Sequence, residues 1–399
     1  MIGVAVLGST GSIGRSTLDV LARHPDRYRV ASLAARRDVA EMQRQCLQWQ
    51  PERALLTDAA AAQELARALR LAGCRTEVLH GPSALQQLAA EADAPVVMAA
   101  ISGAAGLAST LAAARAGKRL LLANKESAVM AGPLLLQALR ASGATLIPID
   151  SEHNAIFQCL PPHWRIGEAV PAVRRLLLTA SGGPFLDWSV AAMARVTPAQ
   201  ACAHPRWKMG AKISVDSATL LNKGLELIEA AMLFSIEPAR IEVLVHPESV
   251  VHSMVEFIDG STLAQLGSPD MRTPIAQALA WPERIAAGVE FLDLLRVRTL
   301  NFRAPDLERF PCLQLARSAA ETGGLCGAWL NAADEVAVQA FLDKRLNFGD
   351  IPAVIATTMD RFGGGEASDL EAVMDADSEA RVIAAAAAVR LADSMRSAS

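Results

Sequence analysis

The first 24 residues read MIGVAVLGSTGSIGRSTLDVLARH, and this stretch decides the fold. A short apolar run is followed by glycines at positions 8, 11 and 14, and then by an amphipathic helical pattern. Glycines in such a turn let backbone N–H groups approach a pyrophosphate at the start of a helix. The spacing is GxxGxxG rather than the commoner GxGxxG, and the spacing alone is weak evidence. We predict dinucleotide binding because the three glycines lie between a strand and a helix.

The alternation of strand and helix continues through the first 150 residues. Apolar strands expected at 4–7, 30–33, 95–100, 119–123 and 145–149 alternate with stretches rich in Ala and Leu, a rhythm typical of a parallel α/β sheet. Strand patterns from 173, at 241–260 and at 261–267 predict a mixed α+β segment. Beyond residue 307 the Ala-rich pattern predicts helices to the end of the chain.

Composition excludes several classes of function. With 399 residues, 52% of them hydrophobic, the chain has room for two or three packed cores. A net charge of −4 with interspersed signs makes a nucleic acid an unlikely partner. Six cysteines without a CxxC pair suit reduced thiols. Pro95, Gly103 and Gly106 interrupt the uncharged run at 94–114, so we expect no membrane span, and the absence of a presequence pattern predicts a cytoplasmic protein.

The second strand ends at Arg36, Arg37 and Asp38, where an NAD-specific protein usually has an acidic residue for the ribose hydroxyls. Guanidinium groups at this place favour a 2′-phosphate, so we predict NADPH as the cofactor. We expect Arg36, Arg37 and Asp38 to contact the cofactor, although the acidic Asp38 is a mild counterargument to NADPH. The alternative is that the arginines form a solvated turn.

Residues 217–226, SATLLNKGLE, offer a hydroxyl, an amide, an ammonium and a carboxylate within about three helical turns. If the run is one helix that begins near Ser217, Asn222 and Glu226 lie on one face with Lys223 beside them. Such a set suits a phosphorylated, metal-bound substrate. A capped surface helix with an exposed Lys and Glu pair remains the alternative.

A second source of carboxylates is LIPIDSEHNAIFQ, where Asp150 and Glu152 leave a predicted strand. In extended backbone both would point the same way, and together with Glu226 they supply three oxygen ligands for one hard cation. Oxygen ligands favour Mg²⁺ or Mn²⁺, while His153 next door leaves a softer ion such as Co²⁺ open. A turn in which Asp150 or Ser151 caps the next helix is the alternative.

Taken in order, the motifs resemble those of the 1-deoxy-D-xylulose 5-phosphate reductoisomerase family along essentially the whole chain. They are GSTGSIG at 8–14, LLANKES at 121–127, DSEHNAIFQ at 150–158, SGGPF at 181–185, HPRWKMG at 204–210, KISVDSATLLNKGLE at 212–226 and GSPDMRTPI at 267–275. The chain departs from the family's usual Gly-Lys-Asn turn at residues 36–38 and from its usual small hydroxyl residue at Lys208.

The resemblance implies roles for individual residues. NADPH contacts are implied for Thr10, Gly11, Ser12, Ile13, Asn124, Glu126 and Gly210, and metal ligation for Asp150, Glu152 and Glu226. Substrate contacts are implied for Lys125, Ser151, Glu152, Ser181, His204, Ser217, Asn222, Lys223 and Glu226. Among these we expect Ser181, Ser217, Asn222 and Lys223 to hold the phosphate, and Lys125, Glu152 and His204 to be catalytic.

The resemblance also implies an architecture. We expect an N-terminal Rossmann-like NADPH-binding domain at 1–150, a central α+β catalytic and dimerisation domain with a flexible loop at 151–281, a linker at 282–306 and a C-terminal helical domain at 307–399. A homodimer is implied. Gly182, Gly183 and Gly210 are expected hinge points of a loop that carries Trp207 and Met209 over the substrate.

The implied reaction converts a ketose phosphate into a branched aldehyde, which NADPH then reduces. The sequence leaves open whether the carbon skeleton rearranges by retro-aldol cleavage or by α-ketol migration, and whether Lys125 or Glu152 moves the proton. Two other functions also remain open. One is a thioester-forming dehydrogenase with Cys159 or Cys202 as its nucleophile, and the other is an NADPH-binding sensor without turnover.

Overall fold

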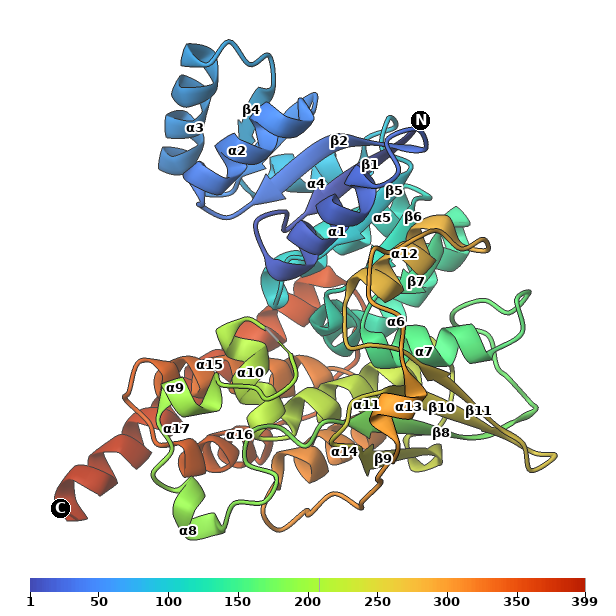
Figure 1. The fold of residues 1–399 in the computed structure, drawn as a ribbon. Helices are drawn as coiled ribbons and strands as arrows, with labels where there is room; N and C mark the ends of the chain where they lie inside the picture. Colours follow the sequence, from blue (N-terminus) through green and yellow to red (C-terminus); the bar gives the residue numbers. More distant parts are fainter. Residues whose placement is uncertain (208, 399) are drawn as a thin grey trace. The chain divides into compact units, whose positions relative to one another are not determined.

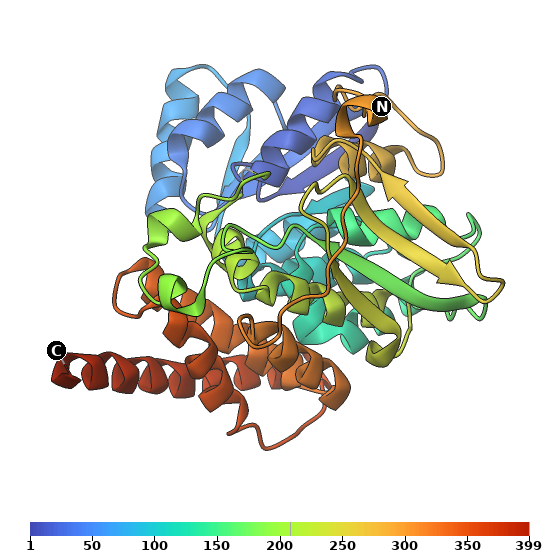
Figure 2. The ribbon, with the colours of Figure 1, turned by 60° about the horizontal axis from the view of Figure 1, so that its bottom comes forward.

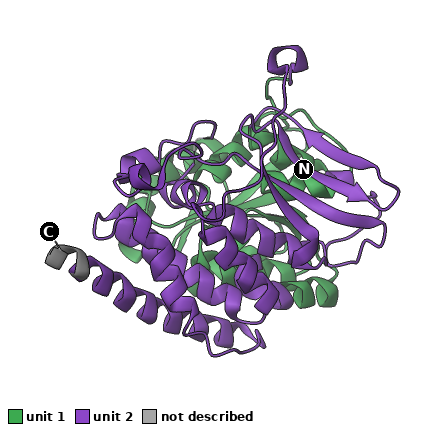
Figure 3. Ribbon diagram, turned by 90° about the horizontal axis from the view of Figure 1, so that it is seen from below, with its two compact units in different colours: residues 1–127, 135–157, 270–291 green, residues 128–134, 158–269, 292–399 purple. Residues whose placement is uncertain are grey.

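The computed structural model describes residues 1–207 and 209–398, with side chains up to Asp393. The chain divides into two compact units (Figure 3). Unit 1 comprises residues 1–127, 135–157 and 270–291, and unit 2 comprises residues 128–134, 158–269 and 292–399. This division differs from the boundaries expected from the sequence, which remain predictions.

Unit 1 is built on a seven-stranded parallel sheet in the order β4-β3-β2-β1-β5-β6-β7. The strands are β1 (Ile2–Leu7), β2 (Tyr28–Ala35), β3 (Arg53–Leu56), β4 (Glu77–His80), β5 (Val96–Ala99), β6 (Arg119–Leu122) and β7 (Thr145–Pro148). The expected strands are all present, whereas β3 and β4 were not predicted. The parallel α/β sheet is therefore confirmed.

Helices cover both faces of this sheet, so the central strands are apolar throughout and Val4, Val6 and Leu7 of β1 are fully buried (Figure 1). The helices of unit 1 are α1 (Ser12–Ala22), α2 (Val39–Trp49), α3 (Ala59–Leu71), α4 (Pro82–Ala90), α5 (Leu107–Arg115), most of α6 (Lys125–Ser142), most of α7 (Ser151–Cys159) and α12 (Arg272–Ala280). The 3-10 turn η1 (Ala104–Gly106) precedes α5.

Helix α12 lies beside α1, although some 250 residues separate them in the chain (Figure 1). Arg272 of α12 pairs with Asp19 of α1 at 3.0 Å. The hydroxyl of Tyr28 and the guanidinium of Arg119 both donate to the carbonyl oxygen of Leu279, at 3.2 and 3.1 Å. These bonds fix residues 270–291 in unit 1.

Unit 2 contains a four-stranded mixed sheet in the order β11-β10-β8-β9. Its strands are β8 (Val173–Ala180), β9 (Ile241–Val245), β10 (Val251–Phe257) and β11 (Thr262–Leu266). Strand β8 pairs in parallel with β9 and antiparallel with β10. The mixed α+β pattern expected here is confirmed.

The remaining helices of unit 2 are α8 (Val190–Met193), α9 (Pro198–Ala201), α10 (Ala211–Ala218), α11 (Leu221–Leu233), α13 (Leu294–Val297), α14 (Cys312–Thr322), α15 (Cys326–Leu342), α16 (Ile351–Met359) and α17 (Leu370–Ala398). The 3-10 turns η2 (Pro238–Arg240) and η3 (Phe348–Asp350) precede β9 and α16. Helices α15 and α17 pack together at the C-terminal end of the chain (Figure 2). Within the described residues, no helix is long and apolar enough to cross a membrane.

Candidate active site

The turn after β1 forms a close-fitting backbone cradle in unit 1. Gly8 has a φ of +90°, and a Cβ there would lie 2.3 Å from the carbonyl oxygen of Ala100. A Cβ on Gly14 would lie 2.3 Å from the carbonyl oxygen of Gly8. Helix α1 begins after Gly11, whose position has no side-chain cap. The turn that carries Thr10, Gly11, Ser12 and Ile13 therefore presents an uncapped helix N-terminus, which suits a phosphate.

Arg36 and Arg37 follow β2, the strand next to β1, and both are exposed. Within residues 1–207 and 209–398, no carboxylate pairs with either guanidinium. The carboxylate of Asp38 accepts a hydrogen bond from the backbone N–H of Glu41 at 3.1 Å and caps α2. The Asp38 carboxylate is thus directed to the start of α2 and is not paired with either arginine.

Asn124 and Glu126 lie where β6 ends and α6 begins. The Asn124 side chain caps α6 by accepting from the backbone N–H of Ser127 at 3.2 Å, and it donates to the carbonyl of Gly103 at 3.3 Å. Glu126 occupies the first turn of α6 and is buried. Both residues share the carboxyl edge of the sheet with the β1 turn, the edge where doubly wound sheets bind nucleotides.

Lys125 and Asp150 form a buried ion pair in unit 1. Burial acts to raise the pKa of Asp150, but Lys125, His153 and the hydrogen bond with Glu152 together outweigh it and hold that pKa well below its ordinary value. Asp150 directly follows β7, and Ser151 and Glu152 begin α7. The expectation of extended backbone at Glu152 is therefore wrong, because the helix starts one residue earlier. The Ser151 hydroxyl donates to Glu152 Oε2 at 2.5 Å.

Helix α7 is anchored by Asn154, whose amide donates to the carbonyl of Pro148 at 2.9 Å and to Gln277 Oε1 at 2.8 Å. These bonds tie the start of α7 to the end of β7 and to α12. They hold the Asp150 and Glu152 carboxylates at the end of a buried strand.

The run 217–226 is two helices rather than the single helix considered from the sequence. Leu220 has a φ of +59°, a left-handed conformation that separates α10 from α11. Ser217 therefore lies in the last turn of α10 rather than at a helix start. Asn222 and Lys223 lie in the first turn of α11 and both bond to Glu226, Asn222 through its amide at 2.5 Å and Lys223 through a buried ion pair. The reading as an exposed surface pair is wrong, because Lys223 is 3% and Glu226 is 1% exposed.

Ser181 and His204 are bonded to each other in unit 2, with 2.8 Å between Oγ and Nε2. His204 Nδ1 accepts from the backbone N–H groups of Arg206 and Trp207, at 3.2 and 3.0 Å. Nδ1 therefore carries no proton, and Nε2 donates to Ser181. Burial lowers the pKa of His204 to about 4, which keeps this neutral form at pH 7.

The Ser181 hydroxyl also accepts from the backbone N–H of Gly183 at 3.2 Å. With both lone pairs engaged, its proton is the group left to meet a ligand. Gly183 has a φ of +69°, and a Cβ there would lie 2.6 Å from the carbonyl oxygen of Ser217. The Ser181 turn thus packs against the end of α10, which places the Ser181 and Ser217 segments together.

Two charged residues that the sequence did not single out, Lys212 and Asp334, support α10. The Lys212 ammonium donates to Asp216 Oδ2 at 2.7 Å and to Asp334 Oδ2 of α15 at 2.6 Å. Burial and the Asp216 carboxylate raise the pKa of Asp334 well above its ordinary value. Because 122 residues separate Lys212 from Asp334, no local pattern could have indicated this contact.

The remaining predicted site residues are placed as follows. Gly210 directly precedes α10 in unit 2. Lys208 lies outside the described residues. Burial raises the pKa of Cys159 to about 11 and raises that of Cys202, so neither thiol has the activated setting that a thioester-forming dehydrogenase needs.

Three family models match consecutive parts of the chain. A model described as 1-deoxy-D-xylulose 5-phosphate reductoisomerase matches residues 4–132, one described as the C-terminal domain of that enzyme matches residues 146–234, and one described as the DXP reductoisomerase C-terminal domain matches residues 266–383.

Whole-chain relatives agree with these models. The 1-deoxy-D-xylulose 5-phosphate reductoisomerase of Cellvibrio japonicus is 57% identical over 96% of this chain and 97% of its own length. That of Aromatoleum aromaticum is 58% identical over 96% of this chain and 94% of its own.

Solved structures match equally far along the chain. The enzyme from Zymomonas mobilis in complex with NADPH has a TM-score of 0.89 at 50% identity, over 97% of this chain and 98% of that one. A reductoisomerase in complex with NADPH, fosmidomycin and magnesium has a TM-score of 0.91 at 46% identity, with the same coverage. Both the sequence and the fold of this chain thus place it in the 1-deoxy-D-xylulose 5-phosphate reductoisomerase family.

Proposed function

We propose that this protein converts 1-deoxy-D-xylulose 5-phosphate to 2-C-methyl-D-erythritol 4-phosphate, with NADPH and a divalent cation, in non-mevalonate isoprenoid biosynthesis. The observation that carries the proposal is identity of 57–58% to reductoisomerases along 96% of the chain. The arrangement of side chains within each unit supports it residue by residue.

The cofactor is NADPH. Gly8 and Gly14 let α1 pack closely against the end of β1, since side chains at these positions would collide with backbone, and the uncapped start of α1 after Gly11 suits a pyrophosphate. The exposed Arg36 and Arg37 supply guanidinium groups for the 2′-phosphate. Further contacts come from Thr10, Ser12, Ile13, Asn124, Glu126 and Gly210. When bound, NADPH supplies the hydride that reduces the aldehyde.

The cation is Mg²⁺ or Mn²⁺, with Co²⁺ as a further candidate, and its ligands are Asp150, Glu152 and Glu226. This donor set fits a hard ion because it consists of carboxylate oxygens. When bound, the cation stabilises negative charge on the substrate's oxygens. In the structure described here Asp150 pairs with Lys125, and Glu226 pairs with Lys223. Each lysine thus supplies the positive charge that a bound cation would supply to the carboxylate.

The substrate phosphate is held by Ser181, Ser217, Asn222 and Lys223. The donor set is complementary to a dianion, because the Ser181 hydroxyl offers its proton and the Lys223 ammonium, which pairs with Glu226 in this structure, would be available to the phosphate if a cation took its place on Glu226. His204 fixes the direction of the Ser181 proton.

Proton movement and charge stabilisation fall to residues at the ends of β6 and β7. Lys125, once Asp150 ligates a cation, places an ammonium beside the substrate oxygens and favours the enediolate and alkoxide forms. Glu152 accepts and returns a proton as the carbon skeleton rearranges, with Ser151 hydrogen-bonded to one of its oxygens. Both retro-aldol cleavage and α-ketol migration are compatible with these roles.

The organisation of the whole protein follows the family's plan in this proposal. Residues 1–150 form the NADPH-binding domain, 151–281 the catalytic and dimerisation domain, 282–306 a linker and 307–399 the helical domain. The segment between Gly183 and Gly210 closes over the sugar phosphate and excludes water from the aldehyde. The enzyme acts as a homodimer in the cytoplasm.

The experiment that tests the function follows NADPH oxidation by absorbance with 1-deoxy-D-xylulose 5-phosphate as substrate. Mg²⁺ or Mn²⁺ is added to one sample and a chelator to the other. Metal-dependent oxidation that yields 2-C-methyl-D-erythritol 4-phosphate is expected. Oxidation that survives chelation but is lost on thiol alkylation would replace the metal-dependent function with a thiol-dependent one, and tight NADPH binding without turnover would indicate a sensor.

A further inference from the structure

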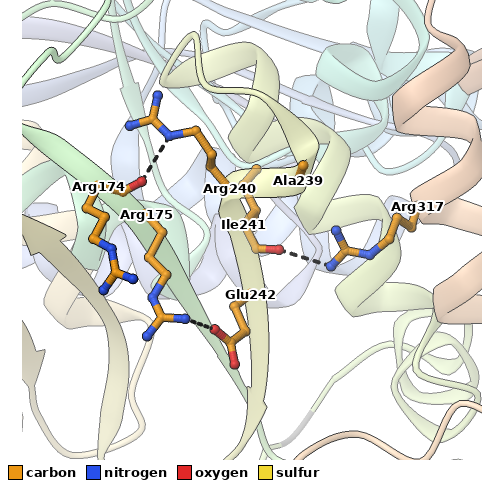
Figure 4. A pocket seen from close by; sticks show the side chains of 7 residues that line it. All are labelled: Arg174, Arg175, Ala239, Arg240, Ile241, Glu242 and Arg317. Carbon is orange, nitrogen blue, oxygen red and sulfur yellow. Dashed lines mark hydrogen bonds and ion pairs between the residues drawn. The ribbon is translucent and has the colours of Figure 1, made fainter.

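A surface cavity in unit 2 is lined by four arginines. It has a volume of about 390 Å³ and is formed by Arg174 and Arg175 of β8, Arg240 of η2 and Arg317 of α14, together with Ala239, Ile241 and Glu242 (Figure 4). This volume lies within the range of about 300–1,000 Å³ typical of small-molecule sites. None of the site residues described above lines it.

The carboxylates around the cavity neutralise only two of the four arginines. Arg174 pairs with Glu256, and Arg175 pairs with Glu256 and with Glu242. Arg240 and Arg317 pair with no carboxylate anywhere in residues 1–207 and 209–393. Four guanidinium groups against two carboxylates leave a surplus of two positive charges at this cavity.

Backbone carbonyls hold both unneutralised guanidinium groups in place. Arg240 Nε donates to the carbonyl oxygen of Arg174 at 2.9 Å, and Arg317 donates to that of Ile241 at 3.0 Å (Figure 4). Arg317 also donates to the carbonyl oxygen of Pro238 at 3.0 Å. Such bonds fix the side chains without removing their charge, and each guanidinium has more N–H groups than these carbonyls use. Binding would therefore cost little side-chain entropy.

The cavity is separate from the proposed substrate phosphate site. Strand β8 runs from Val173 to Ala180 and leads directly to Ser181, whereas Arg174 and Arg175 lie at its beginning. Ser181 lies six positions after Arg175 along an extended strand, which corresponds to about 20 Å. One small ligand cannot bridge the two places.

We propose that this cavity is a binding site for a small multivalent oxyanion of the phosphate class, such as a diphosphate. Arginine recognises phosphate oxygens with paired N–H donors, and a surplus of two charges matches a dianion or a trianion better than a monoanion. Structural bonding alone explains how Arg240 and Arg317 hold η2 and β9. These bonds do not explain why Arg240 and Arg317 line the same cavity, where the carboxylate of Glu242 pairs with Arg175 and with neither of them.

The test is a calorimetric titration of the full-length protein with inorganic diphosphate. The buffer contains a chelator and no divalent cation, because diphosphate would otherwise bind the metal. A Lys223→Gln variant, altered in the proposed substrate phosphate site, separates the two places. We expect this variant to keep the diphosphate affinity of the cavity, and we expect that affinity to fall with rising salt.

The deciding variant is Ala239→Glu. Ala239 is an exposed residue on the cavity wall, so the substitution adds a negative charge and removes no hydrogen bond. We expect diphosphate to bind at least about tenfold more weakly to it. Ala385→Glu on the exposed face of α17 is the matched control and should bind as the natural protein does.

Three results would overturn the proposal. They are equal affinity in Ala239→Glu and the natural protein, binding that disappears in Lys223→Gln, and no binding up to about 10 mM diphosphate. If Ala239→Glu fails to fold, Arg174→Gln replaces it, because that side chain is 63% exposed and pairs with the carboxylate of Glu256. Unchanged affinity in Arg174→Gln would then count against the site.

Discussion

The two ring nitrogens of His204 have different and fixed roles. Nδ1 accepts from two backbone N–H groups, and Nε2 donates to Ser181. A proton on Nδ1 would oppose both backbone donors, so protonation would break this arrangement. This arrangement suits a group that positions Ser181, which is the role we propose for His204 near neutral pH.

Substitution of His204 should affect the binding of the sugar phosphate more than that of NADPH. We expect His204→Ala to raise the KM for the substrate about tenfold, since one hydrogen bond that orients a phosphate donor is lost. His204→Gln retains an N–H donor and should recover part of this loss. Steady-state kinetics with each substrate varied in turn measure the effect, and an equal rise of both KM values would contradict it.

The pH dependence follows from the lowered pKa of His204. The folded value of about 4 lies below the ordinary 6.5, so the neutral imidazole is already in place at pH 6–8. The KM profile should therefore show no His204 ionisation between pH 6 and 8, and KM should rise as the pH falls toward 4. Loss of the low-pH rise in His204→Gln would assign it to this residue.

Glu226→Gln should abolish metal-dependent turnover with little change in NADPH binding. The amide is a weaker ligand for a hard cation, and it leaves the buried Lys223 ammonium without its anionic partner. Turnover with added Mg²⁺ and the Kd for NADPH are the two measurements. Glu321→Gln, on the exposed surface of α14, serves as control. Full activity in Glu226→Gln would remove this residue from the metal site.

Arg36→Ala combined with Arg37→Ala should raise the KM for NADPH far more than the KM for NADH. We expect the ratio of the two KM values to rise about tenfold or more. The two cofactors differ by the 2′-phosphate, and in the described residues no carboxylate competes for either arginine. Arg44→Ala removes an exposed arginine of α2 that is paired with Glu41 and should change neither value. An unchanged preference would show that the phosphate is read elsewhere.

At the scale of elements, an ion-paired cluster connects α10 to α15. Lys212 lies between two buried carboxylates, and its loss would leave Asp216 and Asp334 facing each other. We expect Lys212→Met to lower the free energy of unfolding by about 2–4 kcal/mol, a value reduced because Lys212 is 24% exposed. Chemical denaturation measures it.

Adding Asp334→Asn to Lys212→Met should restore much of that loss, because it removes one of the two opposed carboxylates. The pH dependence has a definite sign. The folded pKa of Asp334 is raised, so its contribution is present at low pH and is lost as the pH rises through that value. The destabilisation in Lys212→Met should accordingly shrink in acid, and a loss that is constant with pH would contradict this account.

The elements best predicted from sequence were those with strong local signals. The turn at Gly8, Gly11 and Gly14 combines three glycines with a strand and a helix, and its position follows from residues within one short segment. The break at Leu220 could not be foreseen, because a leucine in left-handed backbone is unfavourable locally and is maintained by its buried surroundings. The helical start of Glu152 was missed because strand ends are uncertain by a residue or two.

At the scale of the whole molecule, no local pattern indicates that residues 270–291 belong to unit 1. Their bonds reach Asp19, Tyr28 and Arg119, more than 150 residues away. No local pattern indicates the contact between Asp334 and Lys212 either. The carboxylates proposed as metal ligands were predicted from their residue types in short, distinctive segments, whereas the pairing of Asp150 with Lys125 was not predicted from the sequence.

Removal of the metal should stop turnover without unfolding the protein. Asp150 and Glu226 each retain a lysine partner, so chelation leaves no uncompensated buried charge. We expect the thermal midpoint to fall by only a few degrees in chelator, about the change that loss of a weakly bound ligand produces. In Lys223→Met the midpoint should depend more strongly on Mg²⁺. Unfolding of the natural protein by chelator would assign the metal a structural role.

The hydroxyl of Ser181 has consequences for which molecules this enzyme can accept. Since His204 and the backbone of Gly183 occupy its lone pairs, an incoming group meets a donor and finds no acceptor there. An ionised phosphate or phosphonate can accept this hydrogen bond. An ammonium or an amide N–H at the same position would point its own hydrogen at the hydroxyl proton. The turn thus discriminates by the polarity of a single hydrogen bond, and designed inhibitors should present a bare oxygen at this point.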